Sequence, residues 1–117
     1  MSDSGKRIHF VGSAKEDLRD FPDGARQEAG HQLWRLERGL DPDHFKSMPD
    51  VGAGVAEIII DDGDAFRVFY VAKFSEAIYV LHAFNKKTRK TSERDKDRGR
   101  QSYQTIRAIQ RELKKNN

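Results

Sequence analysis

The sequence has no cysteine, only 3 prolines among 117 residues, and no long hydrophobic run. The absence of cysteine excludes disulfides, thiolate metal ligands and a cysteine nucleophile. No stretch approaches the roughly 18 consecutive apolar residues of a membrane helix, so we expect no membrane partner. Residues 1–5 are polar and lack the apolar centre of a secretory signal. We therefore expect a cytoplasmic protein whose first five residues are disordered.

Charged residues, by contrast, make up 35% of the chain, against 36% for hydrophobic residues. This composition predicts a single domain spanning residues 1–117, with a compact core and a heavily charged surface. The net charge of +3 is uneven: residues 85–117 carry a balance of +8 and residues 1–84 a balance of −5. A basic C-terminal part on an acidic body can attract polyanions. The alternative is that the basic residues form a solvated loop that only maintains solubility.

The chain begins with a strand and a helix. Residues 6–11 alternate between polar and apolar side chains, which predicts a first strand. Ser13 and Glu16 have capping-box spacing, which predicts a short helix through Asp20. Pro22 then suits the first turn of a second helix, because its missing N–H group is not needed there.

An apolar stripe with helical spacing predicts the length of this second helix. The stripe consists of Ala25, Ala29, Leu33, Leu36 and Leu40. Gly39 marks the helix end, because glycine adopts the left-handed conformation without steric cost. Trp34 lies beside the stripe, and we expect it at the boundary of the core rather than in a ligand platform.

Strands dominate the second half of the chain, after an expected loop at 41–54. Three strands are predicted, at 55–60, 66–72 and 77–84. The turn at 61–64 contains a glycine and joins the first two as a hairpin. A basic loop at 85–92 leads to a final helix that Ser92 caps and that runs to about Lys115. The order predicts an α+β fold: a small antiparallel β-sheet with two N-terminal helices and one C-terminal helix packed on it.

Arg67 breaks the apolar pattern of its strand, where every neighbour is apolar or aromatic. A buried arginine is costly unless its charge meets an anion, and its guanidinium is shaped to bind carboxylate or phosphate. A structural pair with Glu57 on the neighbouring strand and a functional contact with phosphate explain Arg67 equally well at this point.

The basic loop favours the phosphate interpretation. Its Lys86, Lys87, Arg89 and Lys90 follow the third strand, which we expect to lie beside the strand of Arg67 and to deliver them near the same sheet face. His82 alternates with Val80 and Phe84 on that strand. It is either a structural residue or a proton-transfer group near the loop.

Other chemistries find no motif in the sequence. His9, His31 and His44 have no metal-ligand spacing, and we expect no metal. Residues 52–54 lack the later glycine and the Lys-Ser/Thr pair of a phosphate-binding loop, and no Ser-His-Asp spacing is present. We therefore expect no cofactor.

Four segments together carry a family resemblance. They are FKSMPDVG at 45–52, VAEI at 55–58, FRVFY at 66–70 and LHAFNKKT at 81–88. In this order they resemble the phage-derived HigB-type toxins of the RelE/ParE superfamily, over about residues 6–112. The resemblance implies a RelE-like fold and the toxin of a type II toxin–antitoxin system. It further implies a ribosome-dependent endoribonuclease (an mRNA interferase), with mRNA, the ribosome and a neutralising helix-turn-helix antitoxin as partners.

The resemblance also assigns residues. Arg67 matches the strand arginine that acts on the scissile phosphate, and Lys86 and Lys87 match the basic pair after the last core strand. Further RNA-binding positions are Lys46, Tyr70, Thr88, Arg89 and Lys90, of which Tyr70 closes the arginine motif where packing is its expected role. The chain departs from the pattern at Ile59, because many relatives have a cation there.

The implied reaction is attack of a ribose 2′-OH on its own phosphate, without metal. Arg67 would hold the phosphate oxygens, and Lys86 or Lys87 would be a second clamp or a proton-transfer group. His82 is a further candidate acid or base. Three other interpretations stay open: a ParE-like inhibitor of DNA gyrase, a non-catalytic basic nucleic-acid-binding module, and an inactivated toxin.

Overall fold

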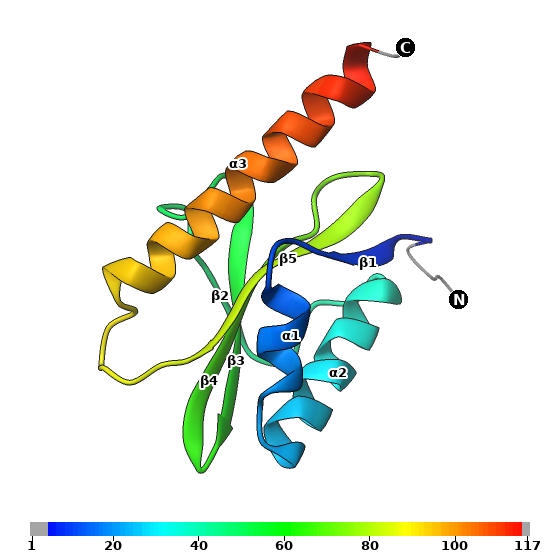
Figure 1. Cartoon of the computed structure of the whole chain (residues 1–117). Coiled ribbons are helices and arrows are strands. Elements are labelled where there is room, and N and C mark those ends of the chain that lie inside the picture. The colour runs from blue at the N-terminus through cyan, green and yellow to red at the C-terminus, as the bar shows by residue number, and fades with distance from the viewer. Residues whose placement is uncertain (1–4, 116–117) are drawn as a thin grey trace.

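The computed structural model describes residues 5–115 (Figure 1). Its elements, in chain order, are β1 (Arg7–Phe10), α1 (Ala14–Arg19), α2 (Asp23–Glu37), β2 (Phe45–Ser47), β3 (Val55–Asp62), β4 (Asp64–Val71), β5 (Ala77–Asn85) and α3 (Glu93–Lys115). The predicted α+β fold, with two N-terminal helices and one C-terminal helix, is confirmed. Among the described residues, no helix has the length and apolar character needed to cross a membrane. The disorder expected for residues 1–4 concerns positions outside the described range.

All five strands form one sheet, in the order β1-β5-β4-β3-β2. The prediction of an antiparallel sheet is wrong in one place: β1 runs parallel to β5, so the sheet is mixed. The intervening helices and strands form the long connection that a parallel pair requires. The loop expected at 41–54 contains β2, a strand of three exposed residues that is too short to show alternation.

Helices cover both faces of the sheet, and each face has its own core (Figure 1). α1 and α2 pack on one face, in a core that includes Leu18, Phe21, Leu33, Ile58, Val68 and Val80. α3 packs on the other, in a core that includes Phe69, Val71, Leu81, Tyr103 and Ile106. Because β4 and β5 are covered on both sides, nearly every residue in them is apolar.

Two glycines are required by this geometry. Gly63 has φ +76° at the tip of the β3–β4 hairpin, as the turn prediction demanded. Gly99 is where α3 comes closest to the sheet: a Cβ added there would lie 2.7 Å from the Phe69 ring and 2.8 Å from Val51. Gly99 therefore sets the distance between helix and sheet.

The predicted helix ends have mixed outcomes. Ser92 caps α3 as expected, since its Oγ accepts the Asp95 N–H at 3.1 Å. The capping box at the start of α1 is wrong, because the Ser13 side chain makes no cap bond and donates instead to the Asp17 carboxylate at 2.8 Å. Trp34 is not a core-boundary residue: it is 47% exposed and stacks on His31.

Candidate nucleic-acid interface

Strand pairing places Arg67 and Lys86 on the same face of the sheet. Arg67 on β4 lies opposite Phe84 on β5, and the Lys86 N–H donates to the Ala65 carbonyl at 2.7 Å. Side chains two residues apart on a strand point the same way, so Arg67 and Lys86 are diagonal neighbours, roughly 7–8 Å apart at Cα. This is the face that α3 covers further along the strands.

The Arg67 guanidinium is compensated inside the protein. Its side chain is 11% exposed, and its Nε lies 3.8 Å from Oε1 of Glu57, whose side chain is only 2% exposed. Nη1 donates to the Phe66 carbonyl at 2.9 Å and to Asp61 Oδ1 at 3.2 Å. Among the described residues, Nε itself has no hydrogen-bond partner. Arg67 and Glu57 thus form a buried ion pair of imperfect geometry, with a donor left unused.

Beside this pair lies a hollow of about 290 Å³, which we call the basic hollow. Five cations line it, namely Lys46, Lys86, Arg89, Lys90 and Lys96, together with the carboxylate of Asp50. Lys96 is paired with Asp50 at 2.8 Å, and this hydrogen bond holds the pKa of Asp50 below its ordinary value and raises the pKa of Lys96. The other four cations are in no ion pair within the described part of the chain, so their charge is available to an external anion.

The loop that supplies these cations rests on the Arg67–Glu57 pair. Thr91 lines the basic hollow, and its hydroxyl donates to Glu57 Oε2 at 3.4 Å. Lys46 on β2 pairs in register with Glu57 on β3. The basic hollow is therefore contiguous with the buried pair, although Arg67 itself does not line it.

Two of the predicted loop residues are engaged elsewhere. The Lys87 ammonium lies 3.9 Å from Asp64 on the β3–β4 hairpin, outside the basic hollow. The Thr88 hydroxyl donates to the Lys90 carbonyl and so stabilises the loop turn. Of the predicted basic pair, the geometry favours Lys86 over Lys87 as the anion contact.

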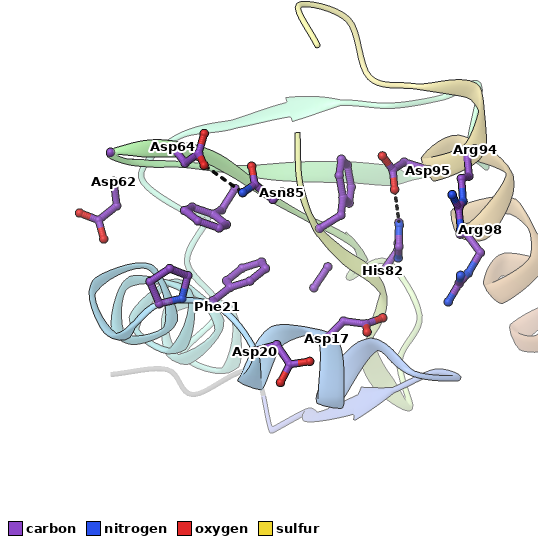
Figure 2. Close-up of a pocket in the computed structure, with 15 residues that line it drawn as sticks. Asp17, Asp20, Phe21, Asp62, Asp64, His82, Asn85, Arg94, Asp95 and Arg98 are labelled. Atoms are coloured by element: carbon purple, nitrogen blue, oxygen red, sulfur yellow. Dashed lines mark hydrogen bonds and ion pairs between the residues drawn. The ribbon is translucent and has the colours of Figure 1, made fainter. Parts of the chain in front are cut away.

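His82 lines a different cavity, although it shares the face of Arg67. Its Nε2 lies 2.8 Å from Asp95 Oδ1, and its ring stacks on Phe84 at 4.8 Å (Figure 2). The expectation that it alternates with Val80 on one face is wrong, because a bulge at Leu81 shifts the alternation and leaves Val80 in the opposite core.

Tyr70 lies on the face opposite Arg67. It is 4% exposed in the core beneath α1 and α2, and this burial raises the pKa of its hydroxyl. The structure therefore gives Tyr70 a packing role, as expected from the sequence. The sequence reasoning missed Lys96, which enters the hollow because Gly99, three residues later, brings the start of α3 close to the sheet.

Residues 16–104 match the profile of the family described as Phage derived protein Gp49-like (DUF891). The chain belongs to this Gp49-like family. The match runs from α1 into α3 and includes β2 to β5, Arg67 and all cations of the basic hollow. The Gp49-like family is RelE/toxin-like, and the mixed sheet with its three helices is consistent with a RelE-like fold. A search of curated proteins and a search of solved structures found no match.

The chemistry open to the Gp49-like site follows from its charges. Four unpaired cations around an open hollow have the charge that suits the phosphates of a polyanion, and such an interaction weakens steeply with salt. Fixed cations also stabilise negative charge that develops on a phosphate during reaction. Arg67 is not in the lining of the hollow, and its guanidinium lies against Glu57 and Asp61.

Proposed function

We propose that this Gp49-like protein is a HigB-type toxin that cleaves mRNA on the ribosome. The observation that supports this best is the cluster of unpaired cations, Lys46, Lys86, Arg89 and Lys90, directly beside the buried Arg67. A structural role needs no such concentration of uncompensated positive charge, whereas recognition of a phosphodiester does.

The proposed reaction needs no metal. The ribose 2′-oxygen forms a bond to phosphorus, the bond from phosphorus to the 5′-oxygen breaks, and the products are a 2′,3′-cyclic phosphate and a 5′-hydroxyl. A base takes the 2′-hydroxyl proton and an acid delivers one to the leaving oxygen. Lys86 holds a phosphate oxygen, and each well-placed donor of this kind contributes about 3 kcal/mol to transition-state stabilisation.

Arg67 is the second phosphate ligand in this proposal. The phosphate reaches it after the loop lifts from Glu57, and the side-chain bond to be broken, Thr91 to Glu57, is long at 3.4 Å. His82, oriented by Asp95, is the further candidate for acid or base. Phe84 stacks against His82 and pairs in register with Arg67, so it separates these two groups.

The direct test is induced expression followed by mapping of transcript ends, and digestion of ribosome-bound mRNA by the purified protein. We expect cleavage products that end in a 2′,3′-cyclic phosphate and begin with a 5′-hydroxyl, in a buffer that retains the magnesium the ribosome itself needs. Products that end in a 3′-hydroxyl and begin with a 5′-phosphate, as attack by a metal-activated water leaves them, would contradict the mechanism.

The loop cations provide the matched variants. Lys86→Ala with Arg89→Ala removes two exposed or half-exposed cations of the basic hollow, and Lys114→Ala with Lys115→Ala removes two exposed cations at the far end of α3. For a single-stranded RNA probe, we expect the first pair to reduce the slope of log affinity against log salt by about 1.4, at about 0.7 per phosphate contact. Equal slopes for the two pairs would refute the assignment of the hollow.

A second function is favoured by one observation. Ile59 lies opposite Arg67 in register, and Glu57 and Asp61 flank Ile59 on the same face of β3. Carboxylates therefore surround the arginine at positions where cations would assist cleavage. A ParE-like inhibitor of DNA gyrase needs no cleavage centre. Toeprinting on ribosomes together with a gyrase supercoiling assay separates the two functions. If both assays are negative, the remaining interpretation is a non-catalytic nucleic-acid-binding module.

The proposed toxin requires a neutralising partner. We expect a helix-turn-helix antitoxin that lays an acidic segment over the basic hollow. The open reading frame next to the gene is the first place to look for it, and co-expression that restores growth is the functional check.

A further inference from the structure

β5 is paired on both sides over only half of its length. β1 lies beside Ala77–Val80, and the last bond of this ladder joins the Val11 N–H to the Val80 carbonyl at 2.9 Å. The chain then turns into α1. On the side of β5 that faces away from β4, no strand of the described part of the chain lies beside β5 beyond Val80. An unpaired strand edge of this kind is a template for another strand.

The free backbone groups on this edge can be identified. The Lys86 N–H bonds to Ala65 on β4, so alternation along the antiparallel ladder directs the backbone groups of Phe84 toward β4 as well. The amides and carbonyls of Ala83 and Asn85, which alternate with them, point away from β4 to the open edge. Outside the strand ladders, none of these four groups takes part in a backbone hydrogen bond within residues 5–115.

This edge forms the floor of a cavity of about 750 Å³ between α1 and α3, which we call the edge groove (Figure 2). Asp17 and Asp20 of α1 form one rim, and Arg94 and Arg98 of α3 form another. The edge groove shares no lining residue with the basic hollow. It is therefore a separate surface from the basic hollow, although His82, the further candidate acid or base, lines it.

The two arginines of the rim lack a carboxylate partner. Arg98 donates to the Ser13 hydroxyl at 3.0 Å, and neither it nor Arg94 is in an ion pair within the described range. Their neighbours on α3 differ, since Lys96 pairs with Asp50 and Arg100 with Asp97. Arg94 and Arg98 lie one helical turn apart, side by side at the groove (Figure 2).

We propose that an extended segment of a partner protein adds a strand to the sheet at the edge groove. Its backbone pairs with Ala83 and Asn85, and its acidic side chains, at alternate positions, bind Arg94 and Arg98. A second copy of this chain fits less well, because α1 and α3 flank this edge and would flank the same edge of the second copy. RNA fits less well because its phosphates would also meet Asp17, Asp20, Asp62 and Asp64. Alternate side chains of a strand point to opposite sides, so the acidic positions of a peptide can face the arginines of α3 alone.

The test uses the full chain and a displayed library of random nine-residue peptides as the probe. We expect selection to recover peptides with acidic residues at alternate positions. Bound peptides should slow hydrogen exchange at the Ala83 and Asn85 amides, and N-methylation of alternate peptide bonds should abolish binding. Failure to recover binders, or peptides that leave these two amides unprotected, would overturn the proposal, as would a dimer that protects them without peptide.

The charge part has its own matched variants. Arg94→Glu with Arg98→Glu should weaken the selected peptides at least tenfold, whereas Arg107→Glu with Arg111→Glu, exposed further along the same helix, should leave affinity within twofold. A peptide in which the acidic residues are replaced by lysine should show the opposite order. Equal losses for both pairs would mean that only net charge matters, and would refute the edge groove as the binding site.

Discussion

Removing the Glu57 carboxylate and the Arg67 guanidinium together should cost far less stability than removing either alone. Glu57 is 1% and Arg67 9% exposed, so each single substitution leaves the other charge buried. Arg67→Met leaves Glu57 without a counter-charge, which costs about 3–5 kcal/mol of unfolding free energy. Glu57→Leu leaves Arg67 with Asp61, but that carboxylate is 72% exposed and recovers at most about 1 kcal/mol.

The double variant replaces both charges with apolar side chains of similar length. Such replacements are neutral or stabilising by about 1–4 kcal/mol. The reason is that the desolvation penalties of two buried charges are removed, while only one attraction between them is lost. The pair also has imperfect geometry, at 3.8 Å with an unused Nε donor, which weakens the attraction that is lost. We therefore expect the double variant to match the wild type within about 1 kcal/mol or to exceed it.

Urea unfolding of the four proteins is the assay. With a denaturant slope of about 2 kcal/mol per molar, Arg67→Met should unfold roughly 1.5–2.5 M earlier than the wild type, and Glu57→Leu roughly 1–2.5 M earlier. Additive losses in the double variant would refute the buried pair. The same double variant is a folded protein without either charge, so its failure to cleave mRNA would assign to the Arg67–Glu57 pair a chemical role that is separate from stability.

Four further substitutions test the packing and the electrostatics of the fold. Gly99→Ala should destabilise the protein by about 1–3 kcal/mol, because the added Cβ meets the Phe69 ring. Gly30→Ala, whose Cβ would have no atom within 4 Å, should instead stabilise α2 by about 0.5–1 kcal/mol. Thermal unfolding measures both changes. Tyr103→Phe should cost about 1 kcal/mol, since the Tyr103 hydroxyl donates to a loop carbonyl at 2.9 Å, and an unchanged urea midpoint would contradict this bond. The hydrogen bond from Lys96 lowers the pKa of Asp50 below its ordinary value of 3.8. The stability that this bond contributes is therefore present above pH 3.8 and is lost as the pH falls through the folded-state pKa. Lys96→Met should raise the pKa of Asp50 toward 3.8, as an NMR titration would show.

Local patterns predicted most of the elements, because each strand and helix is specified by its own residues. The hairpin at Gly63 and the cap at Ser92 depend on neighbours in sequence, and both are present. The parallel pairing of β1 with β5 joins segments nearly seventy positions apart, and no local signal distinguishes it from an antiparallel arrangement. Ser13 makes no cap bond because its backbone, at φ −89° and ψ 9°, lies outside the extended conformation typical of a capping residue, and its hydroxyl donates to Asp17.

The candidate site was predictable to the level of sheet faces but not of cavities. The cost of burying Arg67 identified it as a residue that needs an anion, and Glu57 was among the anticipated partners. Alternation predicted that His82 shares a face with Phe84, which is confirmed, but it could not separate His82 from the basic hollow, because the bond of His82 to Asp95 depends on how α3 packs. Lys87 left the predicted pair for Asp64, a contact that depends on how the loop turns.

The pairing of β1 with β5 has a consequence for synthesis of the chain. Residues 7–10 leave the ribosome early, but the strand that holds them is not complete until residue 85 has followed. At about 5–20 residues per second, this interval lasts roughly 4–15 s. During it the nascent chain has no finished sheet, so a fast-translating host and a slow one expose the same unfinished protein to proteases and chaperones for very different times.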